Sequence, residues 1–450
     1  MKNLTTGFMR GSALASGLLC LAGITACGGG DSTPPARQPD AVAAQQQATA
    51  AAITTQPKAQ AVPAGQPATL SVVASGSGTL SYQWWRNGAA IPGATGASYT
   101  TAALTLADSG DVLSVIVRNE AGSATSNAVA LQVDGIGARV LAGGAIDPAR
   151  AQLDGVGKQA YFLSAGALGG DGSGNLLLAD TQSKSVRKIT PAGVVSTAVA
   201  GAAASAPLQF PRDVAGGPNG VIYVTDSNNA TTSMFVRKIG ADGALTTLDL
   251  GATQGDPAGP GIAPPVFTAI ASDTAGNLYV ASEVTRPGEP ACSSCFKRAI
   301  VRKVAPDGKV TTVFETTGPH SVAPAIADLA VDRNGNLFVL DRGISKVDAR
   351  GVATTLLGTD QAFVNAIAVD AGGNLYFATE PFSGRQSPWP LHAIGKIAPD
   401  GKVTVAADPN GSDARFKTEA WITKPAGLVT DAAGALYVSG NGRVLKLVLP

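Results

Sequence analysis

Val186-Arg187-Lys188-Ile189 is the first of six copies of one pattern, in which an apolar residue, a variable residue, a lysine and an apolar residue follow one another. The other five copies are Val236-Arg237-Lys238-Ile239, Val301-Arg302-Lys303-Val304, Ile344-Ser345-Lys346-Val347, Ile394-Gly395-Lys396-Ile397 and Val444-Leu445-Lys446-Leu447. Their lysines lie roughly 43 to 65 residues apart, a spacing typical of arrays of repeated structural units. The pattern therefore predicts six copies of one unit.

Five of the six copies follow two apolar runs that are joined by a turn of the form Asp-x-x-Gly. The Asp side chain can bond the backbone of its own turn, and Gly adopts positive φ without steric cost. These turns are Asp171–Gly174, Asp273–Gly276, Asp332–Gly335, Asp370–Gly373 and Asp431–Gly434. A second turn, such as Pro306-Asp307-Gly308, follows the lysine and leads into a short β-branched run. Each unit is thus predicted to be a four-stranded antiparallel meander, and such units stack radially into a β-propeller.

The last unit is incomplete, because only four residues follow Lys446. An unpaired strand edge would expose backbone donors and acceptors and would leave the ring open. The segment Arg139-Val140-Leu141-Ala142 precedes the first unit and has the composition of a strand. We therefore expect it to pair with the C-terminal strand and to close a ring of six blades.

Over about residues 138 to 450 the chain resembles the NHL-repeat β-propellers. The resemblance rests on Gly-Asn-Leu-Tyr and its variants, on the Arg-Lys-Ile run and on Asp154-Gly155-Val156-Gly157. The Gly-Asn-Leu segments are Gly174-Asn175-Leu176, Gly276-Asn277-Leu278, Gly335-Asn336-Leu337 and Gly373-Asn374-Leu375. The resemblance implies an all-β fold, and it leaves function open because such propellers include scaffolds, lyases and lactonase-like enzymes.

The N-terminus predicts export. Basic residues flank a short apolar run that ends in Ile24-Thr25-Ala26-Cys27, which resembles a bacterial lipoprotein signal over residues 1–26. The resemblance implies cleavage before Cys27, acylation of its thiol and attachment to a membrane. Gly28, in place of Asp, favours the outer membrane among proteins with this signal. A secretory peptide that is cut nearby without lipidation is the alternative.

Residues 27–52 are predicted to form a disordered tether, since they are rich in Gly, Pro, Gln and Ala and contain almost no large apolar residues. The whole chain carries 33 Lys plus Arg against 32 Asp plus Glu, and only 14% of its residues are charged. No basic field is therefore available to attract phosphate backbones, and we expect no nucleic-acid partner.

Residues 53–133 alternate short strands with Gly-rich turns, at a length that suits one small β-sandwich. The segments Tyr82-Gln83-Trp84-Trp85-Arg86-Asn87-Gly88 and Asp108-Ser109-Gly110 resemble a bacterial immunoglobulin-like domain. The resemblance implies that Trp84 is the core tryptophan. Val72 and Val115 stand where many such domains have paired cysteines, so this fold would depend on packing alone. We expect the domain to act as a spacer.

The long segments of the propeller lie mostly at one end of the ring, where the second strand leads to the third and the fourth leads to the next blade. Such variable loops on a rigid frame usually carry the binding site. Five carboxylates fall at or just past the end of a second strand on this face: Asp180, Asp226, Glu283, Asp341 and Glu380. Converging oxygens would suit Ca²⁺ or another divalent cation. The alternative is that each carboxylate caps its own loop or pairs with a nearby arginine.

Two other groups on this face could carry chemistry. His320 and His392 are the two histidines of the chain, and both fall in loops, so they are candidate acid–base or ligand residues. Cys292 and Cys295 lie in the longest blade insertion, where we favour a local disulfide over a redox motif or zinc ligands.

Two functional hypotheses follow. The first is a non-enzymatic lipoprotein of the cell envelope. One face of its propeller binds a protein or a glycan. The second is a metal-dependent lactonase, lyase or related enzyme with its site at the channel mouth, by analogy with gluconolactonase-type propellers. Those enzymes use Glu, Asn and Asp on inner strands, and Asn365 is the one matching Asn that the sequence places at the start of an inner strand. The mismatch favours the first hypothesis.

Overall fold

The computed structural model describes residues 48–144, 152–199, 208–227, 234–250, 266–285, 297–316, 326–341, 343–358, 364–380, 389–418 and 421–450. Residues Ala48–Pro450 belong to one compact unit. The predicted signal, the lipidation site Cys27, His320, Cys292 and Cys295 all lie outside the described residues. In the described part the chain forms β-strands and short 3₁₀ turns, and none of it is a helix long and apolar enough to cross a membrane.

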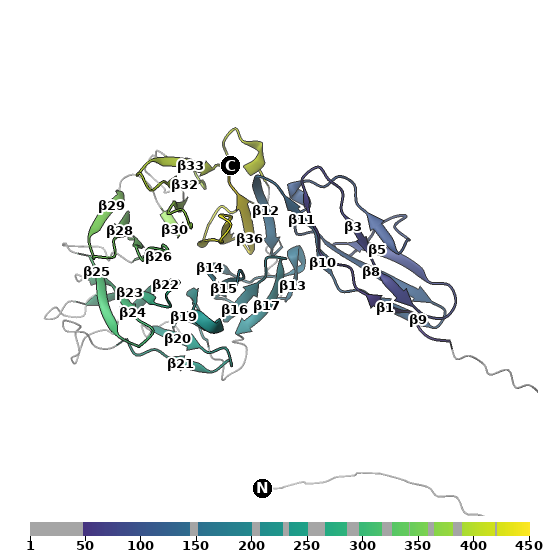
Figure 1. Cartoon of the computed structure of the whole chain (residues 1–450), viewed down its shortest axis with the longest axis horizontal. Helices are drawn as coiled ribbons and strands as arrows, with labels where there is room; N and C mark the ends of the chain where they lie inside the picture. Colours follow the sequence, from purple (N-terminus) through teal and green to yellow (C-terminus); the bar gives the residue numbers. More distant parts are fainter. Residues whose placement is uncertain are drawn as a thin grey trace, which may run out of the picture. The chain divides into compact units, whose positions relative to one another are not determined.

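Six sheets follow one another around a ring in chain order (Figure 1). Blade 1 contains β14 (Ala165–Gly170), β15 (Leu176–Asp180), β16 (Ser185–Ile189) and β17 (Val194–Val199), and blade 2 contains β18 (Asp213–Gly216), β19 (Ile222–Ser227), β20 (Met234–Ile239) and β21 (Leu245–Thr247). Blade 3 contains β22 (Val266–Ser272), β23 (Leu278–Thr285), β24 (Lys297–Val304) and β25 (Val310–Glu315). Blade 4 contains β26 (Asp328–Val331), β27 (Leu337–Leu340), β28 (Ile344–Val347) and β29 (Ala353–Leu357), and blade 5 contains β30 (Val364–Val369), β31 (Leu375–Thr379), β32 (Ile394–Ile397) and β33 (Val403–Ala407).

Blade 6 closes the ring as predicted. Its strands β34 (Gly427–Thr430), β35 (Leu436–Gly440) and β36 (Arg443–Val448) are completed by β12 (Gly137–Ala142), which comes from before the first blade. β12 pairs with β36 in antiparallel register, with Arg139 opposite Lys446. The inner strands β14 and β34 are in contact, so the first and last blades are neighbours. The all-β fold with six blades is therefore confirmed, and five of these blades have four strands.

The repeated motif residues form a small network that is complete in blades 3 and 5. In blade 5, the carboxylate of Asp370 accepts hydrogen bonds from the Asn374 amide at 2.8 Å and from the Tyr376 hydroxyl at 3.1 Å. Tyr376 lies opposite Lys396 in the ladder, and the Lys396 ammonium lies 5.8 Å from the centre of the tyrosine ring. The spaced Asp, Asn, Tyr and Lys of the sequence thus join the turn to the second and third strands.

Blade 1 shows what happens when one member of the network changes. Leu177 stands opposite Lys188, in the position that tyrosine holds in blade 5. Without an aromatic ring to cover, the Lys188 ammonium lies 3.0 Å from the Asp171 carboxylate instead. The lysine therefore retains a partner although the residue across the ladder differs.

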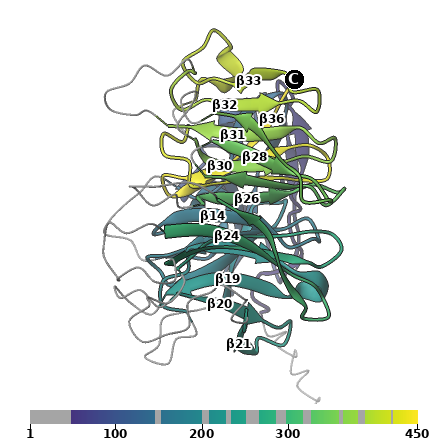
Figure 2. The same cartoon turned by 90° about the vertical axis from the view of Figure 1, so that its left-hand side faces the viewer.

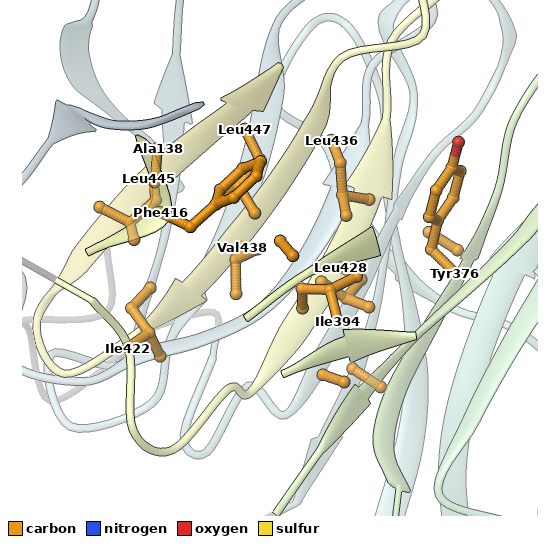
Figure 3. Packing of buried hydrophobic residues seen from close by; sticks show 14 of the residues in the cluster. Ala138, Tyr376, Ile394, Phe416, Ile422, Leu428, Leu436, Val438, Leu445 and Leu447 are labelled. Atoms are coloured by element: carbon orange, nitrogen blue, oxygen red, sulfur yellow. The ribbon is translucent and has the colours of Figure 1, made fainter. Parts of the chain in front are cut away.

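Blades pack against each other through apolar residues of the alternate strand faces. Figure 3 shows the cluster in which Ala138 of β12 and Leu447 of β36 meet Phe416 and Ile422, while Ile394 of blade 5 approaches from the neighbouring sheet. Burial of such residues stabilises the fold by about 25 cal/mol for each Å² of apolar surface removed from water. Figure 2 shows the blades edge-on as stacked layers of strands.

The N-terminal region of the unit is also made of strands. They are β1 (Ala52–Thr55), β2 (Ala61–Pro63), β3 (Thr69–Ser71), β4 (Val73–Ser75), β5 (Ser81–Arg86), β6 (Ala89–Ala90), β7 (Ser98–Thr100), β8 (Val112–Asn119), β9 (Gly122–Thr125), β10 (Val129–Ala130) and β11 (Gln132–Asp134). Trp84 is fully buried among apolar residues that include Val72 and Val115, as predicted. Its indole N–H donates to the Gly96 carbonyl at 2.9 Å. The immunoglobulin-like assignment itself remains a prediction.

Four 3₁₀ turns and one edge strand complete the described elements. The turns are η1 (Leu106–Asp108), η2 (Gly157–Gln159), η3 (Pro218–Gly220) and η4 (Ala414–Phe416), and β13 (Gly155–Val156) adds a fifth strand to blade 1. Lys158 of η2 donates to the Asp111 carboxylate at 2.7 Å, which ties the first blade to the N-terminal strands.

Candidate functional site

A cavity of about 640 Å³ occupies the centre of the ring. All six inner strands contribute to its wall, and the Asp-x-x-Gly turns surround its mouth. Because each inner strand runs toward its turn, the mouth lies at the end of the ring opposite the long loops. The sequence analysis placed the site at the loop end, where most of the long segments lie outside the described residues.

One apolar residue from each inner strand lines the cavity at the same level. These six residues are Leu168, Val214, Ile270, Leu329, Ile367 and Leu428. The next two positions toward the mouth are mostly small, such as Ala215 and Gly216 in blade 2 and Ala271 and Ser272 in blade 3. Small side chains leave the space of the channel open and bring a ligand close to the backbone of the inner strands.

Two aspartates lie just beyond this apolar level, at the first residue of two inner strands, where Asp213 is buried and Asp328 is half-buried. Asp213 begins β18, and its carboxylate accepts hydrogen bonds from the amides of Val214 at 2.8 Å and Ile270 at 2.7 Å. Asp328 begins β26 and accepts from the amides of Leu329 and Ile367, both at 2.8 Å. We call Asp213 and Asp328 the channel pair. Each member bonds its own blade and the next one.

Burial raises the pKa of both carboxyls of the channel pair. The pKa of Asp213 rises to about 6, since removal from water outweighs the two amide hydrogen bonds that stabilise the charged form. The pKa of Asp328 is also raised well above the usual range, first by burial and then by the negative charge of Asp213. The two carboxyls thus titrate as a coupled pair.

The position of the channel pair has a counterpart in three further blades. Ala269, Ala366 and Gly427 occupy it in blades 3, 5 and 6, according to the strand registers and the turn that follows. At Gly427 a Cβ atom would lie 2.5 Å from the Leu168 nitrogen of blade 1. Blades 6 and 1 therefore meet through their backbones at the place where Asp213 and Asp328 bridge other blades.

Asp180 and Asp226, two of the predicted metal ligands, are fully buried at the ends of their second strands. Asp180 accepts from the amides of Leu163 and Ser164, and Asp226 accepts from those of Gln209 and Phe210. These amides precede the inner strand of the same blade. We call Asp180 and Asp226 the loop-capping pair, because each fixes the segment that leads into its own blade.

Each member of the loop-capping pair also has an arginine. Arg187 is fully buried, with its guanidinium 3.7 Å from Asp180 and 2.5 Å from Asp154. Arg237 lies 3.6 Å from Asp226. Burial still raises the pKa of Asp180, although Ser183, the two backbone amides and Arg187 all act in the opposite direction. The arrangement matches the alternative that each aspartate caps a loop and pairs with an arginine.

The other three predicted ligands have separate surroundings. Asp341 accepts from the amide of Gly343 at 3.2 Å, and Glu380 accepts from the side chain of Asn365 at 2.5 Å. Glu283 lies on β23 opposite Ala299 of β24. Among the described residues, no three His, Cys, Asp or Glu side chains come together in a group that could hold a metal ion. A cation site on this face stays a prediction.

His392 has a structural setting in blade 5. Its backbone has a positive φ of 62°, and its carbonyl accepts from the Trp421 indole at 2.8 Å. The residue borders a void of about 10 Å³ that is otherwise lined by apolar residues such as Ile394 and Leu445, and its buried Nδ1 has no hydrogen-bond partner within the described part of the chain. None of the five predicted carboxylates lines this void.

The sequence analysis missed the channel pair, although a signal was present. Arg212-Asp213-Val214-Ala215 and Ala327-Asp328-Leu329-Ala330 each place a carboxylate at the start of an otherwise apolar strand. Aligning the units on their first turns, which are Gly217–Gly220 in blade 2 and Asp332–Gly335 in blade 4, puts the two aspartates at the same position of both blades. A charged residue at the start of a buried strand is costly unless it has hydrogen-bond partners. An aspartate at this position therefore indicates that donors lie close to it in the fold.

No family model matches the sequence, and no curated protein is significantly similar to it. Solved structures do resemble the fold. An auxiliary nutrient binding protein from Bacteroides thetaiotaomicron has 15% identity and a TM-score of 0.48, and the match covers 90% of this chain and 98% of that one. A similar protein from Bacteroides ovatus has 14% identity and a TM-score of 0.46 over 90% and 99% of the two chains.

A gluconolactonase from Xanthomonas campestris is also similar in structure. It has 13% identity and a TM-score of 0.44, and the match covers 64% of this chain and 86% of that one. At these identities and TM-scores the likenesses assign no activity to this chain. Its function has to be argued from its own residues.

Proposed function

We propose that the chain is a non-enzymatic binding protein of the bacterial cell envelope, held to the membrane by a lipid on Cys27. Its propeller binds a glycan or a protein segment at the end of the channel that the Asp-x-x-Gly turns surround. The observation that supports this proposal is the cavity of about 640 Å³, which is within the range of ligand pockets. The N-terminal β domain acts as a spacer between anchor and propeller.

The wall of the cavity favours binding over chemistry. Apolar and small residues dominate it, and the carboxylates of the turns at its mouth are engaged locally. Asp273, for example, accepts from the Asn277 side chain at 2.7 Å and from the Tyr279 hydroxyl at 3.2 Å. Flat sugar faces and short peptide segments suit such a surface, because backbone groups and small side chains can approach them closely.

A substitution at the mouth tests the proposal. Ala371 is exposed and lines the cavity, so Ala371→Trp should narrow the entrance without disturbing the core. Ala241→Trp is the matched control, because Ala241 is exposed on an outer turn of blade 2 at the same end of the ring. The probes are gluco-oligosaccharides of mixed linkage and extended peptides, and binding is measured by calorimetry on the chain without its signal.

We expect at least one probe to bind the unmodified chain and the Ala241→Trp variant equally, and to lose about tenfold in affinity with Ala371→Trp. Equal binding to all three proteins would place the site elsewhere and contradict the proposal. A metal-dependent enzyme is the alternative, and Ca²⁺ and Mn²⁺ belong in the same experiment. A saturable thermal shift that Glu283→Ala abolishes would support that alternative.

A further inference from the structure

The channel pair joins blades that are neighbours in the ring. Asp213 of blade 2 holds the amide of Ile270 in blade 3, and Asp328 of blade 4 holds the amide of Ile367 in blade 5. Ile270 and Ile367 both line the cavity, so the two joints lie at its inner end. Any change in the charge of these carboxyls acts directly on contacts between blades.

Neither carboxyl of the channel pair has a basic partner among the described residues. The strands packed against β18 are β14, β15, β19 and β22, and those packed against β26 are β22, β27 and β30. Their titratable side chains are Asp180, Tyr223 and Asp226. Asp180 and Asp226 already have arginines, and Tyr223 is neutral in ordinary conditions. Ionisation of both channel carboxyls therefore leaves two uncompensated negative charges in the ring.

We propose that Asp213 and Asp328 form a proton-dependent switch of ring stability, in which a proton held by the pair removes the cost of negative charge at the joints between blades 2 and 3 and between blades 4 and 5. With the pair protonated, the amide hydrogen bonds are weaker, because a neutral carboxyl is a poorer acceptor, but no buried charge remains. With both carboxyls ionised, repulsion and burial work against the closed ring. This switch is separate from ligand binding at the mouth.

The direction of the effect follows from proton binding. Both carboxyls have a raised pKa in the folded chain, with Asp213 at about 6, compared with 3.8 for an ordinary aspartate. Between these values the folded state holds more protons than the unfolded state, so stability falls as the pH rises. The stabilisation is complete below about pH 4 and is lost as the pH passes above the folded pKa values.

Urea unfolding of the chain without its signal, at about pH 5 and pH 7.5, tests the switch. We expect the unfolding equilibrium constant to rise at least about tenfold between the two pH values from Asp213 alone. Asp213→Asn and Asp328→Asn should each reduce this rise. Each variant also loses an acceptor for a backbone amide, which lowers stability at both pH values and leaves the ratio as the informative quantity.

Thr225→Val is the matched control. The Thr225 hydroxyl accepts from the Asp213 amide at 3.0 Å, so this variant weakens the same place without removing a titratable group. It should be less stable at both pH values and keep the rise of the unmodified chain. The proposal is overturned if both Asp→Asn variants keep that rise unchanged.

A second measurement decides the matter if the variants do not fold. Infrared spectroscopy of the unmodified chain with ¹³C-labelled aspartate reports protonated carboxyl groups directly. A protonated band that persists at about pH 6 and disappears at higher pH supports the switch, because an ordinary aspartate is ionised there. Absence of that band at pH 6 overturns it.

Discussion

The loop-capping pair and the channel pair contain the same side chain in two different environments. Asp180 and Asp226 each receive two backbone amides and an arginine. Asp213 and Asp328 each receive two backbone amides and have no basic partner among the described residues, and the charge of Asp213 acts on Asp328. The backbone hydrogen bonds of the two pairs are similar in number and length, so hydrogen bonding does not distinguish the two environments. What separates the pairs is whether a cation lies close by.

This difference indicates two uses of buried acid in one ring. The loop-capping pair orders a segment within one blade, and its arginines offset part of the burial cost. The channel pair holds neighbouring blades together and makes their contact sensitive to protons.

The largest expected effect comes from Arg187→Met, which leaves Asp180 buried without its cation and deprives Asp154 of the same partner. Breaking a buried ion pair from one side costs about 3 to 5 kcal/mol of unfolding free energy. Urea unfolding at neutral pH measures it. Arg350→Met is the control, because Arg350 and Asp348 form an exposed pair of the kind that contributes little. Similar losses of unfolding free energy in the two variants would mean that the buried pair contributes no more than the exposed one.

Gly427→Ala probes the contact between blades 6 and 1, where a glycine stands in place of a bridging aspartate. Its Cβ would approach the Leu168 nitrogen to 2.5 Å, so blades 6 and 1 must separate slightly. We expect a loss of about 1 to 3 kcal/mol, as for other overpacked sites. Gly170→Ala serves as the comparison, since a Cβ there meets no atom within 4 Å and its φ is not in the left-handed region. Equal stability of both variants would show that this joint has room.

The coupling within the channel pair can be measured by a double-mutant cycle of Asp213→Asn and Asp328→Asn. We expect an interaction energy of about 0.5 to 3 kcal/mol at pH 7.5 that decreases at pH 5, because only charged carboxyls repel. The cycle of Asp180→Asn with Asp328→Asn joins blades 1 and 4 and should be additive. Additivity in both cycles would mean that the channel carboxyls do not sense each other.

The smallest effect is expected at the turn aspartates. Burial alone would raise the pKa of Asp370, but hydrogen bonds from Asn374, Tyr376 and the turn amides outweigh it and lower the pKa. Tyr376→Phe should therefore cost about 0.5 to 1.5 kcal/mol at neutral pH. The cost should diminish in acid, because a depressed folded pKa gives stability that is lost as the pH falls through it. Unfolding at about pH 3 and pH 7 checks this, and a cost that is unchanged in acid would contradict it.

Blade 4 offers a reciprocal test of that turn, since Phe338 stands where blade 5 has Tyr376. Phe338→Tyr places a hydroxyl near Asp332, in the arrangement that Tyr376 and Asp370 already have. It should raise stability by a similar small amount. A loss would show that the networks of blades 4 and 5 differ in geometry.

The sequence predicted the frame of the propeller because its signals are local and repeated. Asp-x-x-Gly turns, apolar runs and the lysine pattern each fix a hairpin, and six repeats fix the ring. The closing strand β12 could also be predicted, because β36 would otherwise have an unpaired edge. The pairing of Arg139 with Lys446 confirms that argument.

The candidate site was harder to predict because it depends on contacts between blades. Asp213 and Ile270 are far apart in sequence, and nothing local shows that the carboxylate of one reaches the amide of the other. The five carboxylates at strand ends were visible in the sequence, but their direction was not. Asp180 turns to its own loop, and Glu380 turns to Asn365. The sequence also does not show at which end of the channel the cavity opens, because this depends on how side chains pack.

Hydrogen exchange in the presence of a bound probe from the calorimetric experiment tests the proposed function most directly. If the ligand enters at the turn-lined mouth, amide exchange slows in the turns that begin at Asp273, Asp332 and Asp370, while the outer turn near Ala241 is unaffected. Slower exchange confined to the long loops at the opposite end would contradict this account and return the site to the loop face.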